Sequence, residues 1–163
     1  MTSETTVTIC FVCLGNICRS PLAEGVFQDL LKKEGLEERI IVHSAGTGNW
    51  HVGARPDKRM QSTANARGIE LLSTAEQFQP GDFKRFDLVL AMDQSNKESL
   101  DYMGSGKVTK NKLKMFREFD PDHNGDFDVP DPYYGGDQGF ETVFDIVNRT
   151  CPPLLEYIKR ELL

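Results

Sequence analysis

Residues 7–22 read VTICFVCLGNICRSPL, and the predicted architecture of the whole chain follows from this segment. Its first part, residues 7–12, is a short and nearly continuous apolar run rich in β-branched side chains. Such a run is typical of a strand that is buried on both faces in a parallel sheet. Ser20 and Pro21 then predict the N-cap and first turn of a helix, whose apolar residues repeat at helical spacing until Gly35. The stretch therefore predicts a strand, a tight loop and a helix.

The rest of the chain alternates between the same two kinds of element. The apolar runs and capping residues predict further strands at 40–43, 86–92 and 112–116, and helices at 55–67, 93–102 and 140–162, the last one irregular near Pro152 and Pro153. Alternation of this kind predicts an α/β fold, here a single domain over residues 1–163. We expect a small doubly wound (flavodoxin-like) domain with a four-stranded parallel sheet flanked by helices and a phosphate-binding loop after the first strand. Ligands bind such sheets beyond the carboxyl ends of the strands, where the loops 13–20, 44–53 and 93–96 lie.

Composition excludes several classes of protein. Hydrophobic residues make up 39% and charged residues 27% of the 163 positions, which suits a folded domain with a core. No apolar run approaches the roughly 18 residues that a membrane-spanning helix needs. The net charge of −6 opposes nonspecific binding to nucleic acid or to an anionic membrane. The N-terminus lacks the basic segment of a signal peptide, and the cysteines at 10, 13, 18 and 151 suit a reducing compartment, so we expect a cytoplasmic protein. We also expect a monomer, although nothing in the sequence fixes the oligomeric state.

The loop after the first strand carries the chemistry. Cys13 ends the strand and Arg19 stands at the mouth of the helix, where backbone N–H groups and the helix dipole can hold a tetrahedral oxyanion such as phosphate. Gly15 and Asn16 are residue types that tolerate the left-handed backbone of a tight ring. The same groups favour the thiolate form of Cys13, and Ser20 could donate its hydroxyl to the sulfur. The predicted phosphate-binding residues are Leu14, Gly15, Asn16, Ile17, Cys18, Arg19 and Ser20.

A second motif supplies a proton donor. A thiolate that attacks phosphorus needs an acid for the leaving oxygen, and Asp131 lies in the sequence DPYYGG within a long loop of residues 118–139. Tyr133 and Tyr134 follow it directly. Together with Trp50 they could form apolar walls for an aromatic ring.

These motifs resemble those of the low-molecular-weight protein tyrosine phosphatases. The similarity spans essentially the whole chain and covers VCLGNICRSPLAEG at 12–25, SAGTGNW at 44–50, AMDQSN at 91–96 and DPYYGG at 131–136. It implies a cysteine-dependent enzyme that hydrolyses phosphotyrosine in proteins through a phosphocysteine, with no cofactor and no metal.

The resemblance also assigns roles to single residues. It implies that Cys13 is the nucleophile, that Arg19 clamps the phosphoryl oxygens, and that Asp131 is first the general acid and then the base for water. The remaining roles that it implies are a network that shapes the loop (Asn16, Ser20 and Ser44), an entrance (Trp50, Tyr133 and Tyr134) and a second loop cysteine, Cys18, able to form a reversible disulfide with Cys13. Many members carry a histidine in the region aligned with 72–74, where this chain has none.

Some alternatives stay open at this point. A thiol-dependent arsenate reductase could use the same loop but needs a relay cysteine, for which Cys151 is the distant candidate, and a noncatalytic phosphate-binding module would need no nucleophile. Residues 120–131 also fit the spacing of a calcium loop, although with prolines inside it. Cys10 and Cys13 have the C-x-x-C spacing, but on a strand that spacing directs their side chains to opposite faces, which disfavours a redox or zinc pair.

Overall fold

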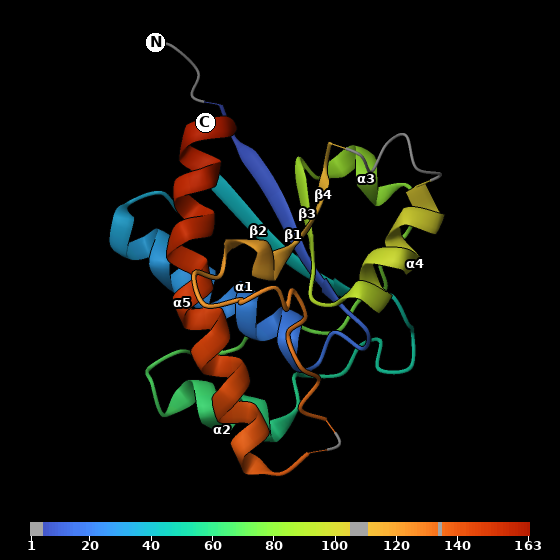
Figure 1. The fold of residues 1–163 in the computed structure, drawn as a ribbon, viewed down its shortest axis with the longest axis vertical. Coiled ribbons are helices and arrows are strands. Elements are labelled where there is room, and N and C mark those ends of the chain that lie inside the picture. Colours follow the sequence, from blue (N-terminus) through green and yellow to red (C-terminus); the bar gives the residue numbers. More distant parts are fainter. Residues whose placement is uncertain (1–4, 105–110, 134) are drawn as a thin grey trace.

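A computed structural model describes residues 5–104, 111–133 and 135–163. Within these ranges it contains one parallel sheet of β1 (Val7–Cys13), β2 (Ile40–Gly46), β3 (Leu88–Ala91) and β4 (Leu113–Met115), in the order β2-β1-β3-β4 (Figure 1). The predicted four-stranded parallel sheet is confirmed. Because β1 is joined to β2 on one side and to β3 on the other, the direction of winding reverses at the carboxyl end of β1, which is where doubly wound folds bind ligands.

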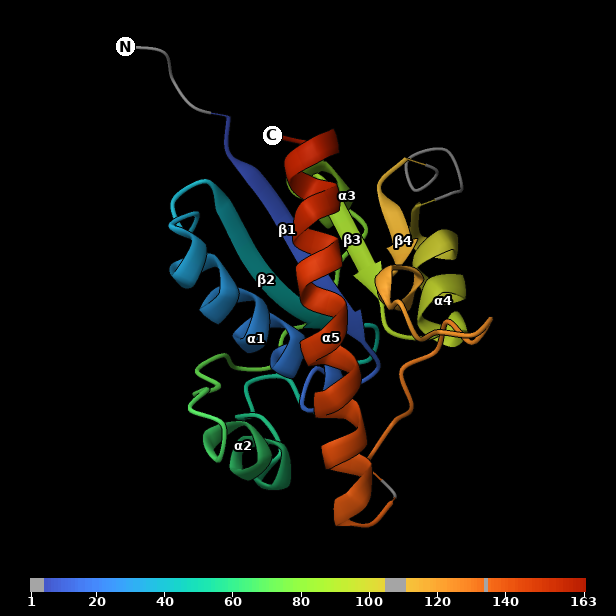
Figure 2. The same cartoon turned by 60° about the vertical axis from the view of Figure 1, so that its left-hand side comes forward.

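Helices cover both faces of the sheet. On one face lie α1 (Arg19–Glu34) and α5 (Asp137–Glu161), and on the other lie α3 (Asp82–Arg85) and α4 (Gln94–Gly104), while α2 (Lys58–Asn65) packs against α5 beyond the carboxyl ends of the strands (Figure 2). The short helix η1 (Phe116–Phe119) follows β4. Among the described residues, no helix combines the length and the apolar character that crossing a membrane requires.

The central strand β1 is buried on both faces, as its composition predicts. Phe11 points into the core below α1 and α5, where its ring meets Phe27 at 5.8 Å and Phe116 at 5.4 Å between centroids. Cys10 and Val12 point into the other core, with residues of α3 and α4. Edge-to-face aromatic pairs of this kind add about 1 kcal/mol each to the apolar burial. Tight packing on both sides holds the end of β1, and with it Cys13, in one place.

The helix boundaries differ from the prediction in four places. The helix α1 begins at Arg19 after Cys18, so Ser20 is not its N-cap. The helix predicted at 55–67 covers only 58–65, because the Asp57 side chain accepts from Arg59 N at 2.8 Å and caps it there. The helix α3 was not predicted, and α5 runs from Asp137 through both prolines without a break. Leu154, Leu155 and Ile158 are fully buried beyond the prolines, and their packing outweighs the lost backbone hydrogen bonds.

Candidate active site

The loop between β1 and α1 curls around the N-terminus of the helix. Asn16 has φ 56°, so the prediction that it adopts a left-handed conformation is confirmed, whereas Gly15 does not have a positive φ. The turn at Asn16 brings its backbone N–H to 3.3 Å from the sulfur of Cys13. The loop therefore closes over the end of β1, with the first N–H groups of α1 beside it.

Ser20 contacts the thiol of Cys13 and does not cap the helix. Its Oγ lies 3.0 Å from Cys13 Sγ, and it accepts a hydrogen bond from Asn16 Nδ2 at 2.7 Å. Because Asn16 donates to this oxygen, the hydroxyl proton of Ser20 has two acceptors within reach, Cys13 Sγ at 3.0 Å and Ala45 O at 3.4 Å. The shorter contact places the hydroxyl to donate to the sulfur of Cys13.

Asn16 joins the loop to β2 through a chain of hydrogen bonds. Its Nδ2 also donates to Ser44 Oγ at 3.0 Å, and Ser44 donates to Glu24 Oε1 at 2.7 Å. Its Oδ1 accepts from Glu76 N at 3.0 Å. The predicted set of Asn16, Ser20 and Ser44 is thus brought together behind Cys13. The extension to Glu24 was not predicted from the sequence.

The region that lacks the family's histidine lies at the end of this chain of hydrogen bonds. Here Ser73 lies beside the carboxyl group of Glu24. Burial raises the pKa of Glu24, the hydrogen bonds from Ser44 and Ser73 oppose this, and the nearby charge of Glu76 raises the pKa further. A carboxyl and two hydroxyls therefore complete the network in this chain.

Backbone contacts lock the loop against β2 and α2. Thr47 N donates to Cys13 O and Gly48 N donates to Leu14 O, both at 2.9 Å, and Asp57 N donates to Ile17 O at 2.8 Å. A Cβ atom at Gly46 would lie 2.7 Å from Leu14 O. Only glycine fits at position 46 without moving the loop. The role of Gly46 could not be found in the sequence, because it depends on the pairing of Gly46 with Cys13 in the sheet.

Arg19 is almost fully buried, with 2% of its surface exposed, and is held by three groups. Its Nη1 donates to Asp93 Oδ2 at 2.7 Å and to Val129 O at 2.9 Å, and its Nη2 lies 3.6 Å from Asp131 Oδ2. Burial alone would lower the pKa of Arg19, but Cys13, Asp93 and Asp131 raise it. The guanidinium is therefore charged and fixed in direction beside Cys13.

Asp93 is a site residue that sequence reasoning assigned only to helix capping. It does cap α4, because its Oδ1 accepts from Asn96 N at 2.7 Å, while its Oδ2 holds Arg19. The sequence did hold a signal for this role, because Asp93 comes soon after β3 and that strand ends beside β1, which carries Cys13.

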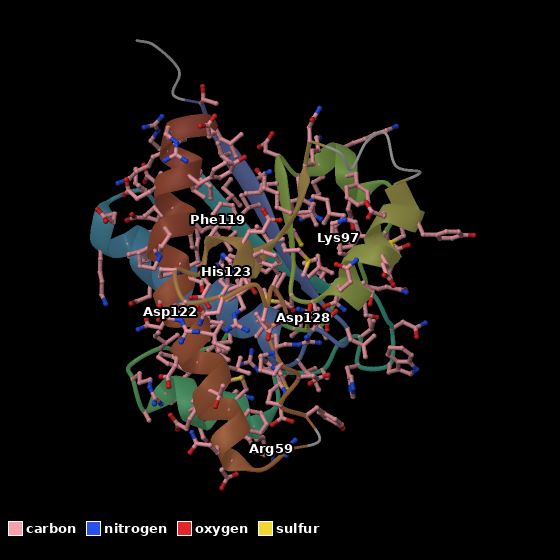
Figure 3. All side chains as sticks on the ribbon, viewed as in Figure 1. Arg59, Lys97, Phe119, Asp122, His123 and Asp128 are labelled. Atoms are coloured by element: carbon pink, nitrogen blue, oxygen red, sulfur yellow. The ribbon has the colours of Figure 1, made fainter. Side chains whose placement is uncertain are left out.

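Asp131 reaches the site on a loop that is anchored to the segment between β3 and α4. Val129 N donates to Met92 O at 2.7 Å, and Asp128 Oδ1 accepts from Gln94 N at 2.8 Å beside the first turn of α4 (Figure 3). Asp131 Oδ1 accepts from Tyr133 N at 3.0 Å, which leaves Oδ2 facing Arg19. The carboxyl group is about one third exposed, at the mouth of the site.

The carboxylates of the proposed calcium loop have other partners. Asp120 is fully buried and accepts from Arg117 Nε at 2.9 Å and Arg149 Nε at 2.8 Å. Burial raises the pKa of Asp120, but the hydrogen bonds from Arg149 and Arg117 outweigh it and lower the pKa to about 2. Among the described residues no group of three or more carboxylates, histidines or cysteines is arranged to hold a metal ion. The geometry gives the calcium alternative no support.

A cavity of about 280 Å³ opens above Cys13. The predicted residues that line it are Cys13, Leu14, Gly15, Ile17, Cys18, Arg19, Trp50, Asp131 and Tyr133. Tyr134 lies outside the described residues. His51 also lines the cavity, with its ring 6.0 Å from that of Tyr133, and sequence reasoning missed it because a lone histidine in a loop carries no pattern. A buried thiol, a fixed cation and a carboxyl group thus face one cavity with aromatic walls.

The other cysteines are poor nucleophiles in this environment. Cys18 is 4% exposed, and burial, with Asp57 and Cys13 adding to it, raises the pKa of its thiol well above the usual range. Cys10 and Cys151 are fully buried, and Cys10 lies on the opposite face of β1 from Cys13, as predicted. Cys151 sits inside α5, so it is not placed to act as a mobile relay for an arsenate reductase.

Comparisons with known proteins agree with this geometry. Residues 8–163 match the family model of low molecular weight phosphotyrosine protein phosphatase. The chain is 40% identical to the low molecular weight phosphotyrosine protein phosphatase of Homo sapiens over 157 residues, which cover 96% of this chain and 98% of the relative. It is also 40% identical to a low molecular weight protein-tyrosine-phosphatase of Streptomyces coelicolor over 158 residues, 96% of each chain.

Solved structures give the same result. The structure of YfkJ from Bacillus subtilis matches with a TM-score of 0.91 and 39% identity over 99% of this chain and all of the other. A protein tyrosine phosphatase from Entamoeba histolytica matches with a TM-score of 0.91 and 35% identity over 97% of this chain and all of the other. The Drosophila arginine phosphatase DARP matches with a TM-score of 0.85 and 30% identity over 94% of this chain and 98% of the other. With its Cys13 loop, its parallel sheet and its close relatives in agreement, the chain belongs to the low molecular weight phosphotyrosine protein phosphatase family.

Proposed function

We propose that this chain, acting as a single domain, hydrolyses phosphotyrosine in proteins through a phosphocysteine. In the first step the thiolate of Cys13 attacks phosphorus, a P–S bond forms, and the P–O bond to the tyrosine breaks. Arg19 and the loop N–H groups neutralise the charge on the phosphoryl oxygens, while Asp131 gives its proton to the leaving phenoxide. In the second step Asp131 takes a proton from water, which attacks phosphorus and releases phosphate and the thiolate.

The convergence of Cys13, Arg19 and Asp131 on one cavity carries the proposal. Arg19 Nη2 lies 3.6 Å from Asp131 Oδ2, and Cys13 lines the same cavity as both. A phosphoryl group bound by Arg19 would therefore lie within one cavity with the nucleophile and the acid, the two groups that in-line displacement requires. Trp50 and Tyr133 supply aromatic walls for a phenyl ring. A protein that only bound phosphate would have no use for the nucleophile and the acid together.

Turnover by wild type and by Cys13→Ser tests the proposal. Wild type should hydrolyse p-nitrophenyl phosphate and a phosphotyrosine peptide, and Cys13→Ser should not. Cys10→Ala is the matched control, because it removes a buried thiol from the other face of the same strand and should keep full activity. Phosphoserine and phosphoarginine peptides and arsenate with thioredoxin test the other substrates. Activity that survives in Cys13→Ser, or that appears only with arsenate or phosphoarginine, would refute the proposal.

The role of Asp131 has its own test. Asp131→Asn should slow hydrolysis of phenyl phosphate about 10²- to 10⁴-fold and affect p-nitrophenyl phosphate much less, because p-nitrophenolate leaves without a proton. Asp126→Asn is the control, since Asp126 lies on the same loop and faces Arg117 instead of the cavity. An equal loss on both esters would remove Asp131 from the acid role.

Statements on location, partners, oligomeric state and redox chemistry belong to the same proposal. The enzyme is cytoplasmic, in keeping with the four free thiols among its residues. It has no nucleic acid or membrane partner, and it acts as a monomer. Cys18 forms a reversible disulfide with Cys13, so peroxide should inactivate wild type and thiol should restore it, whereas Cys18→Ser should not recover. Recovery of Cys18→Ser equal to that of wild type would contradict the disulfide.

A further inference from the structure

A second hollow adjoins the mouth of the active site. It is shallow, has a volume of about 670 Å³ and is mainly apolar. One side is formed by Leu14, Gly48 and Trp50 from the loops around Cys13, and the other by Tyr102 and Met103 from α4. We call these five residues the shelf. Glu98 stands at its rim.

The shelf is continuous with the active-site cavity. Leu14 and Trp50 line both hollows, so a molecule that leaves the cavity past these residues meets the shelf next. The side chains concerned are unusually open to solvent, with exposed fractions of 43% for Leu14, 70% for Trp50 and 90% for Tyr102. Large apolar side chains gathered and exposed in this way mark binding surfaces in soluble proteins.

The two sides of the shelf are fixed relative to the reacting groups. Gly48 N is bonded to Leu14 O, and the ring of Trp50 lies so close over Gly48 that a Cβ there would come within 1.8 Å of the ring atom Cζ3. The helix that carries Tyr102 begins next to Asp93, which holds Arg19. The backbone segments that carry the shelf are therefore tied to the residues around the phosphoryl site, which is the condition for a specificity site on a substrate.

We propose that the shelf binds a large apolar side chain next to the phosphotyrosine of the protein substrate. This inference rests on the proposed function. Because Leu14 and Trp50 line both hollows and an extended peptide advances about 3.3 Å per residue, the side chain in question belongs to a near neighbour of the phosphotyrosine in the peptide. Glu98 at the rim disfavours an acidic neighbour at that point. The shelf should therefore make kcat/KM depend on the sequence of a peptide substrate, whereas a free aryl phosphate is too small to reach it.

The test compares peptides that differ at one position. A phosphotyrosine peptide is made with leucine, serine or glutamate in turn at each of the three positions on either side. For wild type, kcat/KM at one of these positions should be about tenfold higher with leucine than with serine, and lowest with glutamate. Tyr102→Ser should reduce the preference for leucine at least threefold and leave p-nitrophenyl phosphate turnover unchanged. Gly48→Ala, which pushes the Trp50 ring off its place, should reduce the same preference.

The control and the contrary outcomes separate this inference from the proposed function. Leu72→Ser is the matched control, because Leu72 is 68% exposed but lies outside the shelf, and it should keep the preference. A wild type without any preference for leucine, or a preference that survives in both shelf variants, would overturn the inference. A second copy of this chain on the shelf would instead appear in sedimentation as a dimer that Tyr102→Ser dissociates, and this also overturns it. Absence of p-nitrophenyl phosphate turnover by wild type would instead contradict the proposed function.

Discussion

Replacing Gly46 with alanine should damage the active site without touching any group that reacts. The added Cβ would lie 2.7 Å from Leu14 O and 3.1 Å from Asn16 N, whereas ordinary contact begins at 3.4 Å. These neighbours are backbone atoms, so no side chain can swing away, and the loop must retreat by about 0.7 Å from the end of β2. Gly46 does not have a positive φ, so the effect is one of space and not of backbone strain.

The size of the effect follows from that displacement. A shift approaching 1 Å in a catalytic loop costs on the order of 10²-fold in rate, and overpacking costs about 1–3 kcal/mol in stability. We therefore expect kcat/KM for p-nitrophenyl phosphate to fall about 30- to 100-fold, with weaker inhibition by inorganic phosphate and a melting temperature lower by about 2–10 °C.

Gly81→Ala is the control, because nothing lies within 4 Å of its added Cβ, and it should behave as wild type. Wild-type kcat/KM in Gly46→Ala would refute the reasoning that the loop is held in place by its contact with β2. A lower melting temperature together with wild-type kcat/KM would refute it as well, because the loop would then keep its active position despite the added Cβ.

Three further perturbations have defined outcomes. Asp93→Asn removes the charged group that accepts a hydrogen bond from Arg19 at 2.7 Å but keeps an oxygen for the helix cap. Urea unfolding should therefore show a free energy of unfolding lower by about 2 kcal/mol, and kcat/KM should fall. An unchanged variant would contradict the role of this pair. The lowered pKa of Asp120, about 2, means that its stabilisation is complete above the unfolded pKa of about 4 and is lost as the pH falls through about 2. Unfolding measured from pH 6 to pH 2 should show a loss on the order of 2 kcal/mol that Asp120→Asn lacks, and parallel curves for the two proteins would exclude it. The pKa of Glu24 is raised, so its effect on stability depends on pH in the opposite way. Its contribution to folding stability is complete below the pKa of the unfolded state and declines as the pH rises through the pKa of the folded state. Glu24→Gln, whose amide oxygen can still accept from Ser44, should therefore melt higher than wild type at pH 7 and by less at pH 4; a lower melting point at pH 7 would show that the charge is needed.

The parts of the fold that depend on local pattern were predictable. A continuous apolar run is enough to place β1 in the middle of a parallel sheet. Residue type narrowed the left-handed position to Gly15 or Asn16, and the structure shows that it is Asn16. Ser20 shows the limit of such reasoning. Serine before proline is a good capping signal, yet the hydroxyl of Ser20 contacts Cys13 and Asn16 instead, and the helix begins two residues earlier than predicted.

The parts that depend on distant segments could not be predicted from one sequence. The contact of Arg19 with Asp93 spans 74 positions and the hydrogen bond from Asn16 to Ser44 spans 28, so no local pattern records either. For Asn16 and Ser44 the family resemblance supplied what the residues alone did not. It supplied nothing for Glu24 and Ser73, because this chain departs from the family's histidine in that region. The helix α3 has four residues, too few to show a helical period.

The anchoring of the acid loop bears on how this loop can change in evolution. The loop begins at Asp120, which is buried and accepts hydrogen bonds from two arginines. Its last anchor before Asp131 is Val129, whose N–H and C=O groups are both hydrogen-bonded. Only one residue separates Val129 from Asp131, so the anchor at Val129 determines where the acid lies. The outer stretch of 121–127 lies between the anchors, so insertions or deletions there can lengthen or shorten the loop while the acid keeps its register with the thiol. Length variation in this family should accordingly collect before Val129, and a single residue inserted after it should be as damaging as removing the acid itself.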